Sequence, residues 1–523
     1  MDIAGTRTLY SVLASHAAQQ PDSPWLAYEA PGGQVTHWTF FEFLQSVHQV
    51  ANLLQELGIS EGDVVNIHLA NHPAYPQLIL AASYLGAVVM PSNPKGTVDE
   101  LSYLLSHSES RLIFTDTDSL ENVKAASNLP IIICNTGTPL PAGLPVYETE
   151  LARQKTEPPA QKGTATSTVQ LLYTSGTTSR PKGVMLTNTN FIYGSEVLRA
   201  STGLRKDDHH LIPLPLFHAA AQCHALWPSL MVGCRVTILS KFSASRFFIQ
   251  AAAHDATMAA LFSAPLRMIL NQPERPTDNK HRMRNITFAQ GLSEEAYEEW
   301  HRRFNAPLQH LWGMTETCSL PIMSPLTGAR NLAAMGRPVL GYEVRVTDEA
   351  GKEVALGESG QICIRGIPGR SLMAGYLKNP EATEITIRHE ADGTWLYTGD
   401  MARQDENDFL YFMHRGNDLI KRAGENISGV EIESVIATLE NVIDVCVVGL
   451  PDPIRDQEVV AVIVAKADTN LTADIVQQHC ASRLTGYKIP TRVEFLDVLP
   501  RTSVGKIQKN IVCEILMKKD RSK

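Results

Sequence analysis

The segment TSGTTSRPKG at residues 174–183 is the most informative stretch of this 523-residue chain. It follows directly on the apolar run VQLLY (169–173), which is typical of a buried strand, and precedes a helix that could be capped at Thr187 or Asn188. Backbone N–H groups, hydroxyls and a lysine placed after a strand can hold phosphate groups. The segment does not match the G-x-x-x-x-G-K-[ST] pattern of a Walker loop. On composition alone, a Ser/Thr-rich surface turn would explain it equally well.

Upstream of this loop, short apolar runs alternate with helical patterns. Residues 39–57 place apolar side chains at a 3.6-residue period, which predicts an amphipathic helix that ends at Gly58. The runs VVNIHLA, AVVMP and LIFTD then predict strands, with helices between them near 78–84 and 98–107. Such alternation predicts an α/β fold built on mostly parallel, doubly wound sheets. The polar stretch 152–168 is expected to form a surface connection between two such layers.

Downstream of the loop the alternation resumes, with strand candidates VQLLYT, HLIPLPL, RVTILS, AALFSA and NITFAQ. After about residue 416 the pattern changes to the strands VCVVGL, VVAVIVA and VEFLDVL, interleaved with helices that start near Thr472 and Lys506. A run of roughly one hundred residues is enough for a small domain of its own. We therefore predict a large N-terminal domain at 1–416 and a small α+β domain at 417–523.

Composition argues against several classes of protein. The chain carries 46 Lys and Arg against 55 Asp and Glu, a net charge of −9, and no long basic stripe precedes the tail, so nucleic acid is not an expected partner. The longest apolar stretch, near 78–91, falls short of the ~18 residues of a membrane-spanning helix, and the N-terminus does not read as a signal peptide. We expect a cytoplasmic protein with a frayed basic tail at 518–523. The eight scattered cysteines form no C-x-x-C pair and are expected to be free thiols.

Further segments carry groups suited to a nucleotide. WGMTE (312–316) places a hydroxyl and a carboxylate after an aromatic ring, a combination that can hold Mg²⁺ and phosphate beside a base. LYTGD (396–400) ends in an acid suited to ribose hydroxyls, and RTSVGKIQK (501–509) places a lysine in a glycine-bounded loop. Each alone is more often a solvated turn or a helix cap. Together with the loop at 174–183, in this order, they indicate one nucleotide site.

The strings TSGTTSRPKG, TGD (398–400), GEN (424–426) and PRTSVGK (500–506) resemble the adenylate-forming superfamily of acyl-CoA synthetases, luciferase-like enzymes and peptide-synthetase adenylation enzymes. The resemblance covers nearly the whole chain. It implies two sheet-based subdomains and a barrel-like piece in the N-terminal region, followed by a small mobile C-terminal domain. It also implies an acid:thiol ligase that uses ATP, Mg²⁺ and coenzyme A. Such an enzyme activates a carboxylic acid as its acyl-adenylate and hands the acyl group to CoA.

The resemblance assigns roles in the adenylation step. Lys506 would bridge the attacking carboxylate and the α-phosphate, Thr315 would contact the α-phosphate, and Glu316 would bind Mg²⁺. Asp400 and Arg415 would hold the ribose. The remaining ATP-binding residues that it implies are Thr174, Ser175, Gly176, Thr177, Thr178, Lys182, Gln290, Gly291 and Trp312.

Roles in thioester formation follow from the same resemblance. Asn417 would be the hinge of a domain rotation, and Gly424, Glu425 and Asn426 would form the turn beside the pantetheine arm. His218, in PLFHAA, matches the histidine or aromatic residue that gates thiol access to the acyl group. The alternative is a core histidine.

The acyl pocket is expected to involve Trp227, Gly291 and Gly313. The stretch 216–230 is interpreted as a helix that forms one pocket wall, with alanines beside the gate and Trp227 about two turns further on. A tryptophan at that place would close the far end and limit the length of the acid. The alternative is that Trp227 only fills the core.

Departures from the family pattern are local. Trp312 stands where many relatives have tyrosine, Ala289, Gln290 and Gly291 replace the usual Gly-Gly-Ala/Glu stretch, and Asn417 replaces the common Asp or Lys of the hinge. Because of these changes, the rules that relate pocket residues to substrate in better-known members do not transfer to this chain. The preferred angle of the domain rotation is not predicted either.

The sequence indicates the reaction more specifically than it indicates the substrate. TSGTTSRPKGV, IRGIPG, KRAGENIS and the Asn hinge resemble the crotonobetaine/carnitine:CoA ligase subgroup, which implies a small or medium acid, with betaines among the candidates. One alternative is a free-standing adenylation enzyme that loads a carrier-protein thiol. Another, from a different class, is a catalytically silent nucleotide-binding regulator. The sequence leaves monomer and homodimer open.

Overall fold

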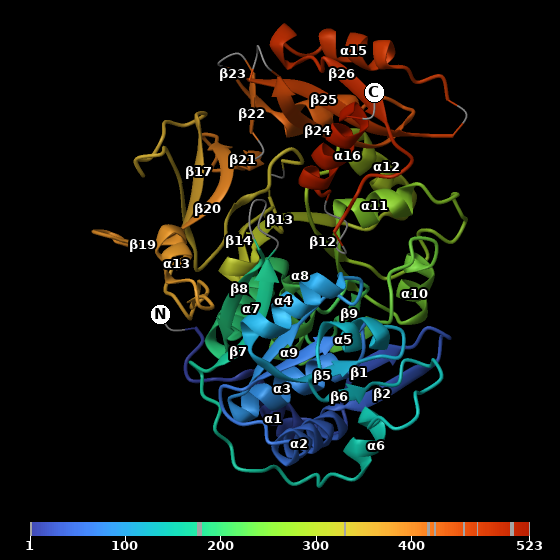
Figure 1. Cartoon of the computed structure of the whole chain (residues 1–523), viewed down its shortest axis with the longest axis vertical. Helices are drawn as coiled ribbons and strands as arrows, with labels where there is room; N and C mark the ends of the chain where they lie inside the picture. Colours follow the sequence, from blue (N-terminus) through green and yellow to red (C-terminus); the bar gives the residue numbers. More distant parts are fainter. Residues whose placement is uncertain are drawn as a thin grey trace.

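The computed structural model describes residues 3–174, 180–328, 331–415, 419–422, 425–452, 456–467, 469–502 and 507–521. A large N-terminal part contains three sheets, and a small C-terminal domain with its own sheet lies at the top of Figure 1. The predicted boundary between residues 416 and 417 lies outside the described residues. The predicted α/β fold with a small α+β C-terminal domain is confirmed.

The first sheet of the large part has seven strands. In spatial order they are β18 (Gly375–Tyr376), β8 (Lys182–Thr187), β7 (Thr168–Thr174), β4 (Val88–Pro91), β3 (Val64–His68), β5 (Ser110–Thr115) and β6 (Ile131–Ile133). The strands from β7 to β6 are parallel, whereas β8 and β18 are added antiparallel at one edge.

The second sheet has nine strands. In spatial order they are β15 (Arg337–Pro338), β14 (Ser319–Met323), β13 (Leu308–Met314), β12 (Asn285–Ala289), β11 (Met258–Phe262), β9 (His209–Ile212), β10 (Arg235–Leu239), β1 (Pro24–Glu29) and β2 (Val35–Thr39). Its central strands are parallel, and β2, β14 and β15 pair antiparallel at the two edges.

Two further sheets complete the chain. The piece expected to be barrel-like is an antiparallel sheet of β16 (Glu343–Thr347), β17 (Ser359–Arg365), β20 (Gly393–Gln404) and β19 (Ile387–Glu390), with β21 (Leu410–Arg415) paired to β20. The small domain is built on β23 (Glu425–Ser428), β22 (Leu419–Arg422), β25 (Asp456–Ala465), β24 (Val442–Asp452) and β26 (Arg492–Phe495).

Helices cover both faces of the seven- and nine-stranded sheets (Figure 1). In the large part they are α1 (Leu9–Gln19), α2 (Phe40–Glu56), α3 (Ala74–Leu85), α4 (Val98–Ser108), α5 (Leu120–Ala126), α6 (Tyr147–Ala152), α7 (Asn188–Thr202), α8 (Ala219–Ala221), α9 (Trp227–Val232), α10 (Phe247–Ala253), α11 (Ser263–Leu270), α12 (Glu294–Phe304) and α13 (Pro380–Thr386), with a π-helical turn η1 (Gln222–Leu226) and a 3₁₀ turn η2 (Thr315–Thr317). In the small domain they are α14 (Gly429–Ile436), α15 (Ala473–Ala481), α16 (Lys509–Arg521) and the 3₁₀ turn η4 (Gly486–Lys488).

The main core lies between the seven- and nine-stranded sheets and includes side chains of α1, α2, α3, α7 and α9. Every residue of α3 is buried, as expected for a helix that is apolar all round. Separate clusters cover the outer faces, with α4 and α5 on the first sheet and α10, α11 and α12 on the second. Each of these sheets is therefore covered on both faces, as the predicted doubly wound arrangement requires.

Several local expectations are confirmed. Helix α2 begins after Thr39, whose hydroxyl accepts from the Glu42 N–H while the Glu42 carboxylate accepts from the Thr39 N–H, a complete capping box. Thr187 caps α7 and Thr472 caps α15. All eight cysteines are free. No helix among the described residues is long and apolar enough to cross a membrane.

Two expectations are wrong. The polar stretch 152–168 does not join two layers, because α6 before it packs on α2 and β7 after it pairs with β4 in the sheet that already holds β6. It runs over α2 and α3, where the Tyr84 hydroxyl donates to the Pro159 carbonyl at 2.6 Å. The described part of the tail is not frayed either, since α16 continues to Arg521 and Asp520 accepts two hydrogen bonds from Arg492, each 2.8 Å long.

Candidate active site

The loop at 174–183 lies in a hairpin. Thr174 at the end of β7 faces Lys182 at the start of β8 across antiparallel strands. Ser175, Gly176, Thr177 and Thr178 lie outside the described residues. The helix expected after the loop is capped at Thr187, but the sequence did not predict β8 between them, because KGVMLT is short and starts beside proline and glycine. Helix α7 begins only at Asn188, so its N-terminus does not directly follow the loop.

Lys182 and Glu316 both contact the side chain of Tyr376, a residue that the sequence did not single out. The Lys182 ammonium lies 4.6 Å from the centre of the Tyr376 ring. The Tyr376 hydroxyl donates to Glu316 Oε1 at 2.8 Å. The glutamate is only 6% exposed, so its carboxylate is held in a mostly dry environment. The dipeptide GY at 375–376 carries no motif that would have revealed this contact.

The WGMTE segment spans the end of β13 and the 3₁₀ turn η2. Thr317 fixes this turn, because its hydroxyl accepts from the Met314 N–H at 3.2 Å and lies 2.8 Å from the carbonyl oxygens of both Met314 and Ser319, to either of which it can donate. Gly313 allows β13 and β14 to approach each other, since a Cβ there would lie 2.5 Å from the Ser319 carbonyl oxygen. This packing accounts for Gly313 without an acyl pocket, whose position remains a prediction. Thr315 lies next to Glu316 in the turn.

Trp312 and Asp400 are joined directly. The Trp312 indole N–H donates to Asp400 Oδ2 at 3.0 Å, and both residues are buried. Asp400 in β20 is also the cross-strand partner of Arg415 in β21, so the two residues implied for the ribose share one register position. The N–H edge of the indole is thus held by the Asp400 carboxylate, a hydrogen bond that the sequence did not predict.

Gln290 and Gly291 follow the carboxyl end of β12, beside β13 in the parallel sheet. Gln290 adopts a left-handed conformation with φ of 67°, which turns the chain away from the strand. A Cβ at Gly291 would lie 4.0 Å from the His310 ring. Ligands of open α/β sheets bind outside the carboxyl ends of parallel strands, so this position fits the role that the sequence predicts.

His218 lies at the start of the helical stretch 219–232 and is partly buried. Its ring packs on Phe217 with centroids 4.5 Å apart. Burial lowers the pKa of His218 to about 4, so the imidazole is neutral at neutral pH. A neutral ring is compatible with both the gate and the core alternative.

Trp227 is fully buried in the main core. Its indole N–H donates to Gln222 Oε1 at 3.1 Å. Its ring packs edge-on against the Phe191 ring, with the two ring centroids 6.2 Å apart. The predicted helix through this stretch is interrupted by the π-helical turn η1. Complete burial favours the core alternative, and a pocket role for Trp227 stays a prediction.

Substitution of Trp227 by alanine separates the two roles. If the indole only fills the core, we expect unfolding to become easier by roughly 3–5 kcal/mol with an unchanged preference for acid length. If it also closes the acyl pocket, kcat/KM should shift toward longer acids. Denaturant titration together with kcat/KM for acids of increasing length measures both effects. An unaltered length profile in a folded, destabilised variant would remove Trp227 from the pocket.

The residues implied for the small domain are mostly outside the described part. Lys506, Asn417 and Gly424 are among those not described. Glu425 and Asn426 lie in β23, which pairs with β22.

An ion pair between described residues joins the large N-terminal part to the small domain. Arg267 in α11 pairs with Asp444 in β24 at 3.8 Å, and Arg501 of the PRTSVGK segment contacts the same carboxylate.

The described residues contain no cluster of three or more His, Cys, Asp or Glu that could hold a metal by themselves. A Mg²⁺ ion is ordinarily bound by one or two carboxylates together with substrate phosphates and water. Glu316, which shares Tyr376 as a neighbour with Lys182, provides such a single carboxylate. The donor set therefore fits a nucleotide-bound Mg²⁺ better than a permanent metal centre.

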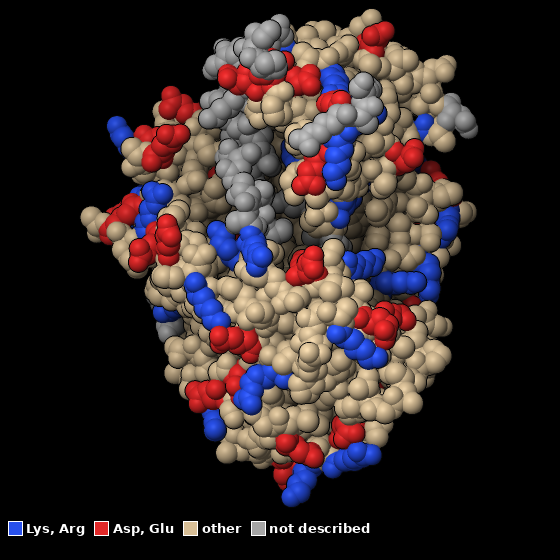
Figure 2. Space-filling model, viewed as in Figure 1, with Lys and Arg blue, Asp and Glu red and all other residues tan. Residues whose placement is uncertain are grey.

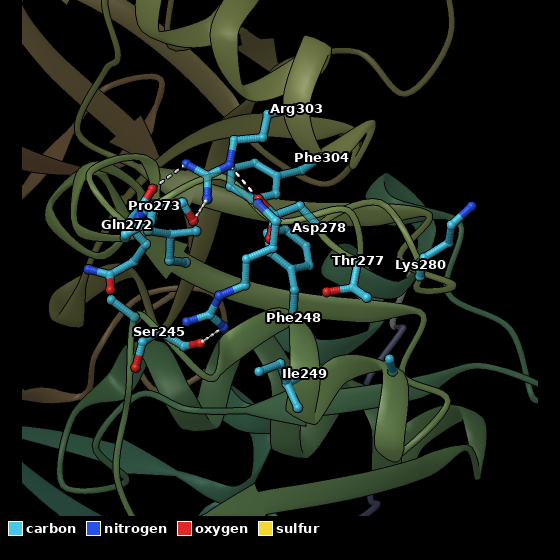
Figure 3. A pocket seen from close by; sticks show the side chains of 14 residues that line it. Ser245, Phe248, Ile249, Gln272, Pro273, Thr277, Asp278, Lys280, Arg303 and Phe304 are labelled. Carbon is cyan, nitrogen blue, oxygen red and sulfur yellow. Dashed lines mark hydrogen bonds and ion pairs between the residues drawn. The ribbon is translucent and has the colours of Figure 1, made fainter.

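A cavity lies away from these residues. It has a volume of about 250 Å³ and is bordered by α10, α11 and residues 272–280 (Figure 3). None of the predicted site residues lines it. Its buried arginine, Arg303, is already engaged by Asp278 and by the carbonyls of residues 270, 272 and 273. We assign no part of the nucleotide site to this cavity.

Comparisons with known proteins identify the family of the chain. The profile of the family described as AMP-binding enzyme matches residues 13–377, and that of the AMP-binding enzyme C-terminal domain matches residues 431–506. The chain is 33% identical over 516 residues to the crotonobetaine/carnitine–CoA ligase of Salmonella agona, covering 97% of this chain and 99% of that protein. It is 32% identical to the ligase of the same name from Escherichia coli K12, covering 98% and 100% of the two chains.

Solved structures give the same result. ATP-bound MatB from Rhodopseudomonas palustris superposes with a TM-score of 0.85 at 27% identity, over 97% of this chain and 98% of that one. The o-succinylbenzoate CoA synthetase of Bacillus subtilis, in complex with its acyl-adenylate intermediate, superposes with a TM-score of 0.82 at 26% identity, with the same coverage. The predicted resemblance is confirmed. The chain belongs to the AMP-binding enzyme family.

Proposed function

We propose that the chain is an ATP-dependent carboxylic acid:CoA ligase that works through an acyl-adenylate and releases AMP and pyrophosphate. The observation that carries the proposal is the convergence of Lys182, Tyr376 and Glu316 beside the linked pair Trp312 and Asp400. This arrangement provides groups for phosphate, metal and ribose in one region. Relatives named CoA ligases match almost the full length of the chain, which supports CoA as the acceptor.

In the first half-reaction the carboxylate of the acid attacks the α-phosphorus of ATP, and pyrophosphate leaves. Lys182 and the loop that follows Thr174 would hold the β- and γ-phosphates, and Thr315 would contact the α-phosphate. Lys506 would neutralise charge that develops on the phosphoryl oxygens and would hold the attacking carboxylate. Mg²⁺, bound by Glu316 and the phosphates, would supply further charge stabilisation. Asp400 and Arg415 would fix the ribose, and Trp312, Gln290 and Gly291 would border the base.

In the second half-reaction the CoA thiolate attacks the adenylate carbonyl, and AMP departs. Lys506 at the adenylate would obstruct the thiol, so we propose that the small domain, from residue 417 onward, rotates about Asn417. The rotation would replace Lys506 by the turn Gly424, Glu425 and Asn426 beside the pantetheine arm. His218 would gate the approach of the thiol.

The hinge is tested by Asn417→Pro. Proline fixes φ near −65° and should hinder the rotation, so we expect adenylate to form at nearly the wild-type rate while thioester turnover falls by about tenfold or more. Rapid-quench measurement of the two half-reactions separates these steps. Glu406→Pro, at the second position of the β-turn that the Asp408 N–H closes on the Asp405 carbonyl, is a control for a proline in a nearby turn. Unchanged thioester turnover in Asn417→Pro would place the hinge at another residue.

The substrate class that we propose is a small or medium carboxylic acid, with betaines such as crotonobetaine and carnitine as the first candidates. The named relatives support this choice. Because ATP and CoA are intracellular metabolites, we also propose a cytoplasmic location.

A screen of carboxylic acids for ATP-dependent pyrophosphate release, with and without CoA, tests the proposed function. An acid:CoA ligase should release pyrophosphate in a single burst without CoA and turn over repeatedly with it. Turnover with a carrier-protein thiol but not with CoA would instead indicate a free-standing adenylation enzyme. ATP binding without pyrophosphate release for any acid would indicate a silent regulator.

A further inference from the structure

Tyr376 lies in a short strand that is fixed at both ends. In β18, Gly375 and Tyr376 pair with Met185 and Val184 of β8, and the Leu377 N–H donates to the Gly183 carbonyl at 2.8 Å. The strand therefore moves together with the hairpin that carries the phosphate loop.

The residues just before β18 are held by other elements. The Met373 N–H donates to the Glu316 carbonyl at 2.8 Å, which ties this segment to the WGMTE turn. Asn190 in α7 donates to the Leu372 carbonyl at 2.7 Å, and the Tyr342 hydroxyl donates to the Ser371 carbonyl at 3.0 Å. The backbone thus connects the phosphate hairpin and the acidic turn through one segment.

The Tyr376 side chain contacts both the Lys182 ammonium and the Glu316 carboxylate. Its ring carries the Lys182 ammonium on one face at 4.6 Å, and its hydroxyl donates to Glu316 Oε1 at 2.8 Å. The residue is 5% exposed, so both contacts are shielded from water. Burial and the neighbouring glutamate raise the pKa of Tyr376 well above its usual range, which keeps the phenol a hydrogen-bond donor.

We infer that Tyr376 is a positioning residue that orients both the metal-binding carboxylate of Glu316 and the phosphate-binding ammonium of Lys182. The inference rests on the proposed function, because it concerns how that site receives Mg²⁺ and ATP. A carboxylate whose one oxygen accepts a fixed hydrogen bond has a defined orientation toward a metal, as supporting partners of metal ligands generally provide. A cation over a tyrosine ring is likewise restricted in position.

Two substitutions separate these contacts. Tyr376→Phe removes the hydroxyl and keeps the ring under Lys182, whereas Tyr376→Leu removes both. The readout is the Kd of ATP by calorimetry, with excess Mg²⁺ and with EDTA, and the ratio of the two Kd values is the Mg²⁺ enhancement. Tyr147→Phe is a matched control, because it removes another buried tyrosine hydroxyl, one that donates to Gln77 at 3.0 Å. Thermal unfolding verifies that each variant is folded.

We expect Tyr376→Phe to lower the Mg²⁺ enhancement about tenfold with little change in metal-free ATP affinity. Tyr376→Leu should also weaken metal-free ATP binding about three- to tenfold. In a Glu316→Gln background, Tyr376→Phe should have no further effect on the enhancement, because the residue acts through Glu316. An enhancement in Tyr376→Phe equal to that of the wild type would overturn the inference. Absence of ATP binding by the wild type would overturn the proposed function itself, and the inference with it.

Discussion

Replacing Lys506 by alanine is expected to slow adenylate formation by about 10²–10³-fold while leaving the conversion of supplied acyl-adenylate to thioester near the wild-type rate. The reason is that charge develops on the α-phosphoryl oxygens only in the first half-reaction. In the second, AMP is the leaving group and Lys506 would have been withdrawn by the hinge. Single-turnover pyrophosphate release measures the first step, and thioester formation from synthetic acyl-adenylate measures the second.

Lys519→Ala is the matched control for loss of a lysine in the small domain. Lys519, on α16, pairs with Glu494 on β26 and has no proposed role. It should change neither rate appreciably. If Lys506→Ala slowed both half-reactions equally, the assignment of Lys506 to adenylation alone would be wrong.

Glu316→Gln should lower the rate of adenylation by about 10²-fold or more and raise the Mg²⁺ concentration needed for half-maximal rate. The amide can still accept the Tyr376 hydrogen bond, so the substitution removes the charge with little change of shape. Pyrophosphate release as a function of Mg²⁺ concentration measures both quantities.

The same exchange at Glu406, an exposed residue between β20 and β21, is the control and should leave the Mg²⁺ dependence unchanged. A Glu316→Gln variant with the wild-type Mg²⁺ requirement would mean that another group binds the metal. That result would direct the search for the metal ligand to other carboxylates and to residues 175–179.

Features that depend on local pattern were predictable from the sequence. The 3.6-residue period and the Thr39 cap define α2, and continuous apolar runs define the parallel strands, because strands buried on both faces need no polar alternation. The small domain was predictable for a similar reason, since its strands and helices follow one another closely after residue 416.

Features that depend on chain contacts distant in sequence were not predictable. Tyr376 and Glu316 are 60 residues apart, and Trp312 and Asp400 are 88 apart, so neither hydrogen bond has a local signature. Strand β8 was missed because its pairing with β7, rather than its composition, stabilises it. The π-helical turn near His218 arises within an apparently regular helical stretch and likewise has no simple period.

Charged groups on the face of the molecule in Figure 2 are of both signs and interspersed. The chemistry of the chain is therefore better sought in its buried and loop residues than in a field of one sign on this face. The proposed mechanism depends on the formation of an acyl-adenylate.

Oxygen transfer from the acid to the nucleotide tests that claim most directly. With a carboxylic acid labelled with ¹⁸O in both carboxylate oxygens, attack on the α-phosphorus followed by thiol attack on the carbonyl leaves one labelled oxygen on AMP. Mass spectrometry of the products after complete turnover should find one ¹⁸O in AMP, one in the thioester carbonyl and none in pyrophosphate. Formation of unlabelled ADP together with ¹⁸O-labelled inorganic phosphate would show that the acid is activated at the γ-phosphorus. That result would contradict an acyl-adenylate.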